Sequence, residues 1–86
     1  MAALTDQQIG ILDLEARHWR HVGSKEQAIR AELGLSATRY HQLLNALIDE
    51  PAALERQPVL VNRLRRLREQ RRAARSDRRP RLPVAR

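Results

Sequence analysis

Residues 36–45 carry polar side chains of the types that read base edges in DNA. Asparagine and glutamine pair bidentately with adenine, arginine pairs with guanine, and threonine contacts the thymine methyl group. Four apolar side chains in residues 40–47 recur at steps of three and four residues, which predicts the inward face of a helix: Tyr40, Leu43, Leu44 and Leu47. The outward positions are then Ala37, Thr38, Arg39, His41, Gln42 and Asn45. They form either a base-reading surface or an ordinary solvated helix face, and Arg39 is the leading candidate for a base or phosphate contact.

A block of arginines supplies a second candidate site. The net charge is +7, but residues 1–62 hold six basic and eight acidic side chains, whereas residues 63–86 hold eleven arginines and two acids. Such a block can be a solvated face, yet too few acids lie nearby to neutralise it. Phosphate is the natural partner, and counterion release then makes binding steeply salt-dependent. The predicted contacts beyond the outward helix positions are Ser36, Lys25, Arg63, Arg66, Arg71 and Arg72.

Other chemistry has little support in the sequence. His18 and His21 stand at metal-ligand spacing, but a surface position near a helix end is the simpler interpretation. The absence of cysteine excludes disulfides, thiolate zinc sites and cysteine nucleophiles. No order of serine, histidine and acid, no phosphate-binding glycine loop and no carboxylate pair is evident. We therefore expect no enzyme activity, no cofactor, no metal and no small-molecule substrate.

Residues 24–48 contain the elements that would position the polar helix. Ser24 and Gln27 have the spacing of a capping box. Gly34 stands at a turn that commonly requires a positive φ, and Ser36 is a good N-cap for the following helix. The preceding helix has an apolar face made of Ala28, Ile29 and Leu33. This order predicts a helix-turn-helix whose second helix enters the major groove.

The rest of the chain is expected to support that pair of helices. Eighty-six residues make one small domain, and one Trp, one Tyr and no Phe leave aliphatic side chains to build the core. No stretch alternates with a period of two, so we predict an all-α bundle. A first helix over 6–21 begins at a Thr5–Gln8 capping box and ends at Val22–Gly23. Its predicted inward stripe is Ile9, Leu12, Ala16 and Trp19.

Prolines divide the C-terminal part of the chain. The third helix ends before Pro51, residues 52–57 form a short helical turn, and Pro58 starts a last helix that docks through 59–68. Leu60, Leu64 and Leu67 form its apolar stripe. We therefore predict a helical domain over 1–68 and an arginine-rich arm over 69–86, disordered from Ser76 onward. No apolar run approaches membrane-spanning length and no targeting segment is evident, so the expected location is cytoplasmic.

Two stretches of the chain closely resemble a known family: ILDLEARHWRHVGSKEQAIRAELGLSATRYHQLLNALIDEP, and PVLVNRLRRLR after it. This is a family of short actinobacterial proteins, long catalogued as a domain of unknown function, some of which are described as nucleoid-associated DNA-binding proteins. The resemblance covers about residues 4–70. It implies a small helical protein that binds the chromosome in the nucleoid and affects transcription. Arg30 departs from the commonest helix-turn-helix pattern, which has alanine at that position.

These observations favour a DNA-binding, transcription-modulating protein with double-stranded DNA as its partner. A homo-oligomer is plausible, because a monomer with one half-site would bind weakly. Two alternatives remain open: an RNA- or ribosome-associated protein, because an arginine arm does not distinguish nucleic acids, and a protein-interaction module on the transcription machinery.

Overall fold

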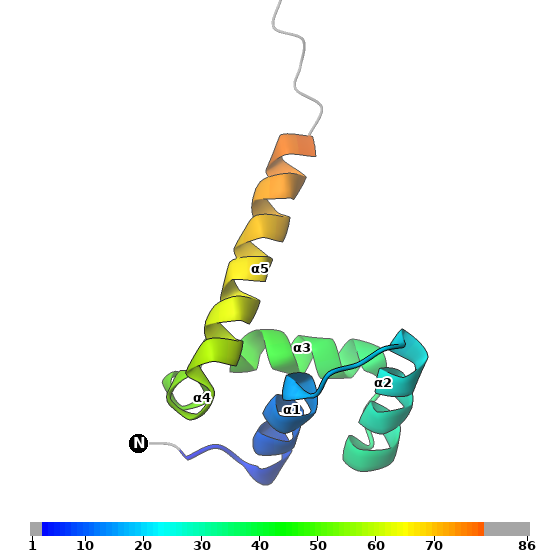
Figure 1. Ribbon diagram of the computed structural model, residues 1–86. Coiled ribbons are helices and arrows are strands. Elements are labelled where there is room, and N and C mark those ends of the chain that lie inside the picture. The colour runs from blue at the N-terminus through cyan, green and yellow to red at the C-terminus, as the bar shows by residue number, and fades with distance from the viewer. Residues whose placement is uncertain (1–2, 79–86) are drawn as a thin grey trace, which may run out of the picture.

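The computed structural model describes residues 3–78, and side chains as far as Arg75. These residues form helices and connecting turns, without a strand (Figure 1). The segments are α1 (Asp6–Ala16), α2 (Val22–Ala28), the π-helical η1 (Ile29–Leu33), α3 (Ala37–Leu47), α4 (Pro51–Arg56) and α5 (Pro58–Arg78). The predicted all-α class is confirmed. Each helix within 3–78 is too short or too polar to cross a bilayer. The predictions for 79–86 lie outside the described residues.

The core consists of aliphatic side chains and one tyrosine ring. Helix α3 lies across the molecule and packs against α1 and η1, while α4 and the start of α5 close the bundle at its C-terminal end (Figure 1). No polar or charged residue within 3–75 is buried, apart from Tyr40 with its hydroxyl group. The core residues are Ile11, Leu12, Leu14, Ile29, Tyr40, Leu44, Leu47, Ile48, Ala53, Leu60 and Val61.

Several local signals in the sequence are confirmed by the helix ends. The Thr5 hydroxyl accepts from the Gln8 amide (3.1 Å), and the Gln8 side chain accepts in return from the Thr5 amide (2.8 Å). Ser36 caps α3 by accepting from the Arg39 amide at 3.1 Å. Gly34 has a φ of 67°, the left-handed conformation that glycine adopts without a Cβ clash. These features depend only on near neighbours in the chain.

The predictions for the first two helices are partly wrong. Helix α1 ends at Ala16 rather than near residue 21, because Trp19 folds back and its indole Nε1 donates to the Leu14 carbonyl at 3.0 Å. The chain then re-enters a helix at Val22, so Ser24 lies inside α2 and caps nothing. The predicted stripe of α1 also fails in part. Ala16, a member of that stripe, is exposed. Ile11 and Leu14, which the predicted stripe did not include, are buried in the core.

Helix α5 leaves the bundle part-way along its length. Leu60 and Val61 are buried and Leu64 packs against the core, which confirms the predicted docking of this helix. Leu67 is 40% exposed, one turn further on. Beyond it the helix continues to Arg78 and projects away from the other helices (Figure 1). The sequence predicts disorder from Ser76, whereas the backbone of 76–78 is helical in the structure.

Gly10 allows α1 and η1 to approach closely, and this yields a test. A Cβ atom at position 10 would stand 2.9 Å from Leu33 Cδ2. Helix propensity alone predicts that Gly10→Ala stabilises the fold by about 1 kcal/mol. We expect the shift required of the Leu33 methyl group to reduce that gain, and Gly10→Ala to be more stabilising in a Leu33→Ala background. Urea unfolding of the four proteins in this double-mutant cycle measures the coupling, and strictly additive effects would contradict it.

Candidate nucleic-acid interface

The outward side chains of α3 lie on the surface as predicted. Thr38, Arg39, His41 and Gln42 are all exposed, whereas Tyr40, between them in sequence, is fully buried. An Arg39 guanidinium nitrogen donates to Gln42 Oε1 at 3.2 Å, so these two exposed side chains lie together. Arginine and glutamine are two of the residue types that form bidentate contacts with bases. The face has the chemistry needed to read a base edge.

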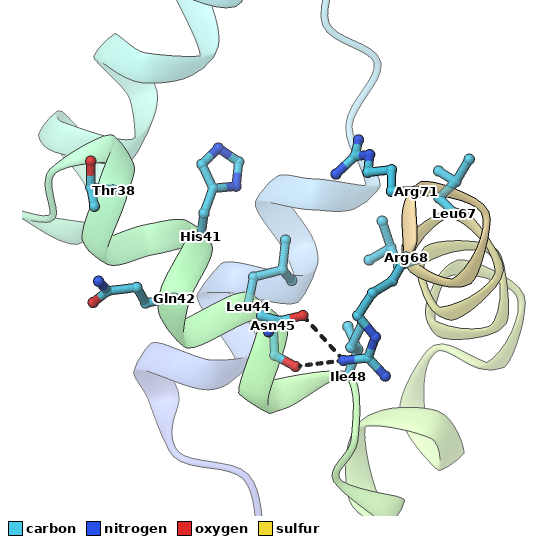
Figure 2. Close-up of a pocket in the computed structure, with 10 residues that line it drawn as sticks. Thr38, His41, Gln42, Leu44, Asn45, Ile48, Leu67, Arg68 and Arg71 are labelled. Carbon is cyan, nitrogen blue, oxygen red and sulfur yellow. Dashed lines mark hydrogen bonds between the residues drawn. The ribbon is translucent and has the colours of Figure 1, made fainter. Parts of the chain in front are cut away.

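A groove of about 730 Å³ runs between α3 and α5. One wall is the polar face of α3, the other is the side of α5 that turns toward it, and the floor is apolar. His41 on α3 and Arg71 on α5 extend over the space between the helices (Figure 2). The lining residues are Thr38, His41, Gln42, Leu44, Asn45, Ile48, Leu64, Leu67, Arg68 and Arg71. The groove thus brings four predicted α3 contacts together with Arg71 but leaves Arg39 outside.

Two arginines of α5 hold the C-terminal end of α3. Arg65 Nε donates to the Ile48 carbonyl at 2.6 Å. The Arg68 guanidinium donates to Asp49 through both terminal nitrogens (2.7 and 3.1 Å) and to the Asn45 carbonyl and side-chain oxygens (3.2 and 3.1 Å; Figure 2 shows the bonds to Asn45). These cations satisfy carbonyl groups that a helix C-terminus leaves unpaired.

The role of this arginine pair follows from its position on α5. Arg65 and Arg68 come four and seven residues after the fully buried Val61, and so share the helix face that packs on the bundle. That spacing was the available signal in the sequence, but it does not reveal that carbonyl groups stand opposite. The pair fixes α5 against α3.

The Asp49–Arg68 pair predicts a pH dependence of stability. The hydrogen bonds and charge of Arg68 lower the pKa of Asp49 from its ordinary value. Because the folded pKa lies below the unfolded one, the pair stabilises the fold above the unfolded pKa, and this contribution disappears as the pH falls through the folded pKa. Asp49→Asn should therefore destabilise the protein modestly at neutral pH and progressively less in acid. Urea unfolding of both proteins across the carboxylate range measures this, and a pH-independent difference would contradict it.

The other predicted α5 contacts are exposed. Arg63 and Arg66 lie on the docked half of the helix but outside the groove, and Arg71 lines the groove. Arg72 forms an ion pair with Glu69 at 3.2 Å, and both side chains are about two-thirds exposed. Exposed pairs of this kind contribute little, so Arg72 can exchange its partner at small cost. All four arginines are accessible to an anion.

Lys25, one of the predicted DNA contacts, is paired within the bundle. Its ammonium group lies 2.8 Å from a carboxylate oxygen of Glu15 and 5.6 Å from the centre of the Tyr40 ring, and its side chain is only 20% exposed. The lysine therefore joins α2 to α1 and α3. Its ammonium group already has a carboxylate partner, and Lys25 does not line the groove between α3 and α5. Ser36 caps α3, and Ala37 behind it is partly buried.

The Tyr40 hydroxyl completes this internal network. It donates to Glu15 Oε1 at 2.6 Å and lies 3.3 Å from the Ile11 carbonyl oxygen. Burial, together with the Glu15 carboxylate, raises the pKa of Tyr40 far above its ordinary value, so the phenol remains a donor. The network positions α3, and with it the candidate interface, on α1.

The two histidines at metal-ligand spacing are both exposed, His18 after the end of α1 and His21 before the start of α2. Within the described residues, no three side chains of the metal-binding types come together. The described part of the chain thus gives the groove between α3 and α5 as the candidate site.

Comparison with known proteins identifies a family. A family model described as "Protein of unknown function (DUF3263)" matches residues 3–76. The chain belongs to this family. The match extends from before α1 into the last turns of α5, so both walls of the groove lie within the family's span. No curated protein and no solved structure matched the chain. The predicted membership of this chain in a family of unknown function is therefore confirmed.

Proposed function

We propose that this protein binds double-stranded DNA, with α3 in the major groove and the arginines of α5 on backbone phosphates. One observation carries the proposal: the exposed polar face of α3 and the arginine-rich side of α5 form two walls of the same groove. The turn at Gly34–Ser36 and the capped start of α3 support the interpretation of α2, η1 and α3 as a helix-turn-helix.

The charge distribution supports a nucleic acid as the partner. The exposed arginines of α5 face solvent with a single carboxylate, Glu69, on the same helix before Ser76. Like charges at this density repel one another, and a polyanion relieves that repulsion. Together with the resemblance of the chain to nucleoid-associated proteins, this leads us to propose a chromosome-binding protein that modulates transcription.

Binding to duplex DNA across a salt series tests the proposal. If about four of the eleven arginines in residues 63–86 each neutralise one phosphate, the logarithm of the binding constant should fall with the logarithm of salt concentration at a slope of about −3.6. A pool of random duplexes selected by the protein should then be enriched in a short motif if the side chains of α3 read bases. Absence of binding near physiological salt would overturn the proposal.

Competition with structured RNA provides the matched control. A-form RNA has a deep, narrow major groove that side chains cannot read. A protein that places α3 in a major groove should therefore prefer the DNA duplex. Equal or tighter binding to RNA of the same length would favour the RNA-associated alternative.

A further inference from the structure

The bundle-facing side of α5 changes from leucine to arginine where the helix leaves the bundle. Leu60, Leu64, Arg68, Arg71 and Arg75 follow one another at steps of three and four residues and so lie on one face. Leu60 is buried and Leu64 partly buried, whereas the arginines at 71 and 75 are exposed. The cationic end of this stripe therefore continues the side of α5 that lines the groove.

The lining of the groove is chemically complementary to a sugar–phosphate strand. It offers hydrogen-bond donors from Thr38, His41, Gln42 and Arg71, and contains no carboxylate. Asp49, which follows the lining residue Ile48 in the chain, already receives two hydrogen bonds from Arg68. Exposed apolar surface is also present, because Leu67 lies 40% exposed beside these donors. A strand of DNA presents both apolar deoxyribose carbons and anionic phosphates.

We propose that the groove between α3 and α5 holds the backbone of one DNA strand, with Arg71 and Arg75 on its phosphates and Leu67 against its sugars. This rests on the proposed DNA binding and assigns unequal roles to the arginines of α5. Arg75 lies one turn beyond the groove-lining Arg71 on the same face of α5, whereas Arg63 and Arg66 are exposed on other sides of the helix, so they contribute only to the general positive field. Because Arg65 and Arg68 fix α5 to the end of α3, the strand and the major groove read by α3 belong to the same duplex.

Two charge-matched double variants test the unequal roles. Arg71→Ala with Arg75→Ala, and Arg63→Ala with Arg66→Ala, each remove two exposed positive charges from one helix, and alanine preserves the helix. Binding of the full chain to a short duplex across a salt series should show that the first pair weakens affinity by about tenfold to a hundredfold and lowers the salt slope by about 1.8. The second pair should change the slope little.

The outcomes separate this inference from the proposed function. If the unmodified protein binds DNA but both pairs reduce affinity and slope equally, the groove assignment is overturned while DNA binding stands. If the unmodified protein does not bind DNA, both are overturned. Unequal losses in the stated order support both.

A second measurement reports on the groove directly. The chain contains no cysteine, so Leu67→Cys places a single thiol in the groove, and Val59→Cys places one on the start of α5, where Val59 is 82% exposed. Alkylation by the neutral reagent iodoacetamide should be slowed severalfold at Leu67→Cys by saturating DNA and remain unchanged at Val59→Cys. Unchanged alkylation at both thiols in the presence of bound DNA would overturn the assignment.

Discussion

Replacing Tyr40 with alanine should remove a large part of the folding free energy. The ring is fully buried between α1 and α3, and truncating a buried aromatic side chain costs about 3–5 kcal/mol. A domain of this size has a total stability of roughly 4–13 kcal/mol at 0.05–0.15 kcal/mol per residue. The substitution also leaves Glu15 without the hydroxyl group that donates to it at 2.6 Å. Urea unfolding followed by helical circular dichroism measures the loss.

Tyr40→Phe is the matched control for the ring. It keeps the apolar volume and removes only the hydroxyl group, while Lys25 still pairs with Glu15. We expect a cost of about 1.5–3 kcal/mol, as for a hydrogen bond to a charged group. The ring and the hydroxyl group are then separable contributions. If Tyr40→Ala were no more destabilising than Tyr40→Phe, the ring would not be the anchor of α3 that the packing indicates.

Deleting residues 69–86 should weaken binding to every DNA sequence. The segment carries seven arginines and two acids, and it begins after the part of α5 that packs on the bundle. Loss of about four phosphate contacts should reduce affinity by roughly a hundredfold to a thousandfold at physiological salt and flatten the salt dependence. Because Leu60, Leu64 and Arg68 remain, the unfolding transition should move little. Binding to cognate and random duplexes, with thermal unfolding alongside, measures both effects.

Arg39→Ala is the complementary variant, because Arg39 is exposed on α3 and lies outside the groove. If Arg39 reads a base, cognate affinity should fall by about 1–3 kcal/mol while affinity for random DNA falls less. The truncation and this substitution should therefore affect different properties, total affinity and sequence preference. If both variants lost equal affinity for cognate and random DNA, α3 would not determine sequence preference separately from the contribution of α5 to total affinity.

Much of the fold could be predicted because its signals are local. The Thr5 and Ser36 caps, the positive φ of Gly34 and the helix starts at Pro51 and Pro58 depend on residues within one turn of each other. The inward face of α3 is equally local, since apolar spacing alone places Tyr40, Leu44 and Leu47 in the core. The end of α1 was not predictable in this way, because the indole of Trp19 competes for the Leu14 carbonyl only once the chain has turned back.

The candidate site likewise has features that local sequence signals predict and features that depend on tertiary contacts. The sequence by itself determined which side chains of α3 face outward, because their positions follow from helical spacing around a leucine stripe. It also determined that the positive charge lies in the last third of the chain.

Only the tertiary structure decided which cations are available to a ligand. Lys25 is taken up by Glu15, and Arg65 and Arg68 by the end of α3, whereas Arg71 lines the open groove. The physical reason is that a cation's availability depends on what lies opposite it. Those partners are ten or more residues away in the sequence, where spacing along one helix carries no information.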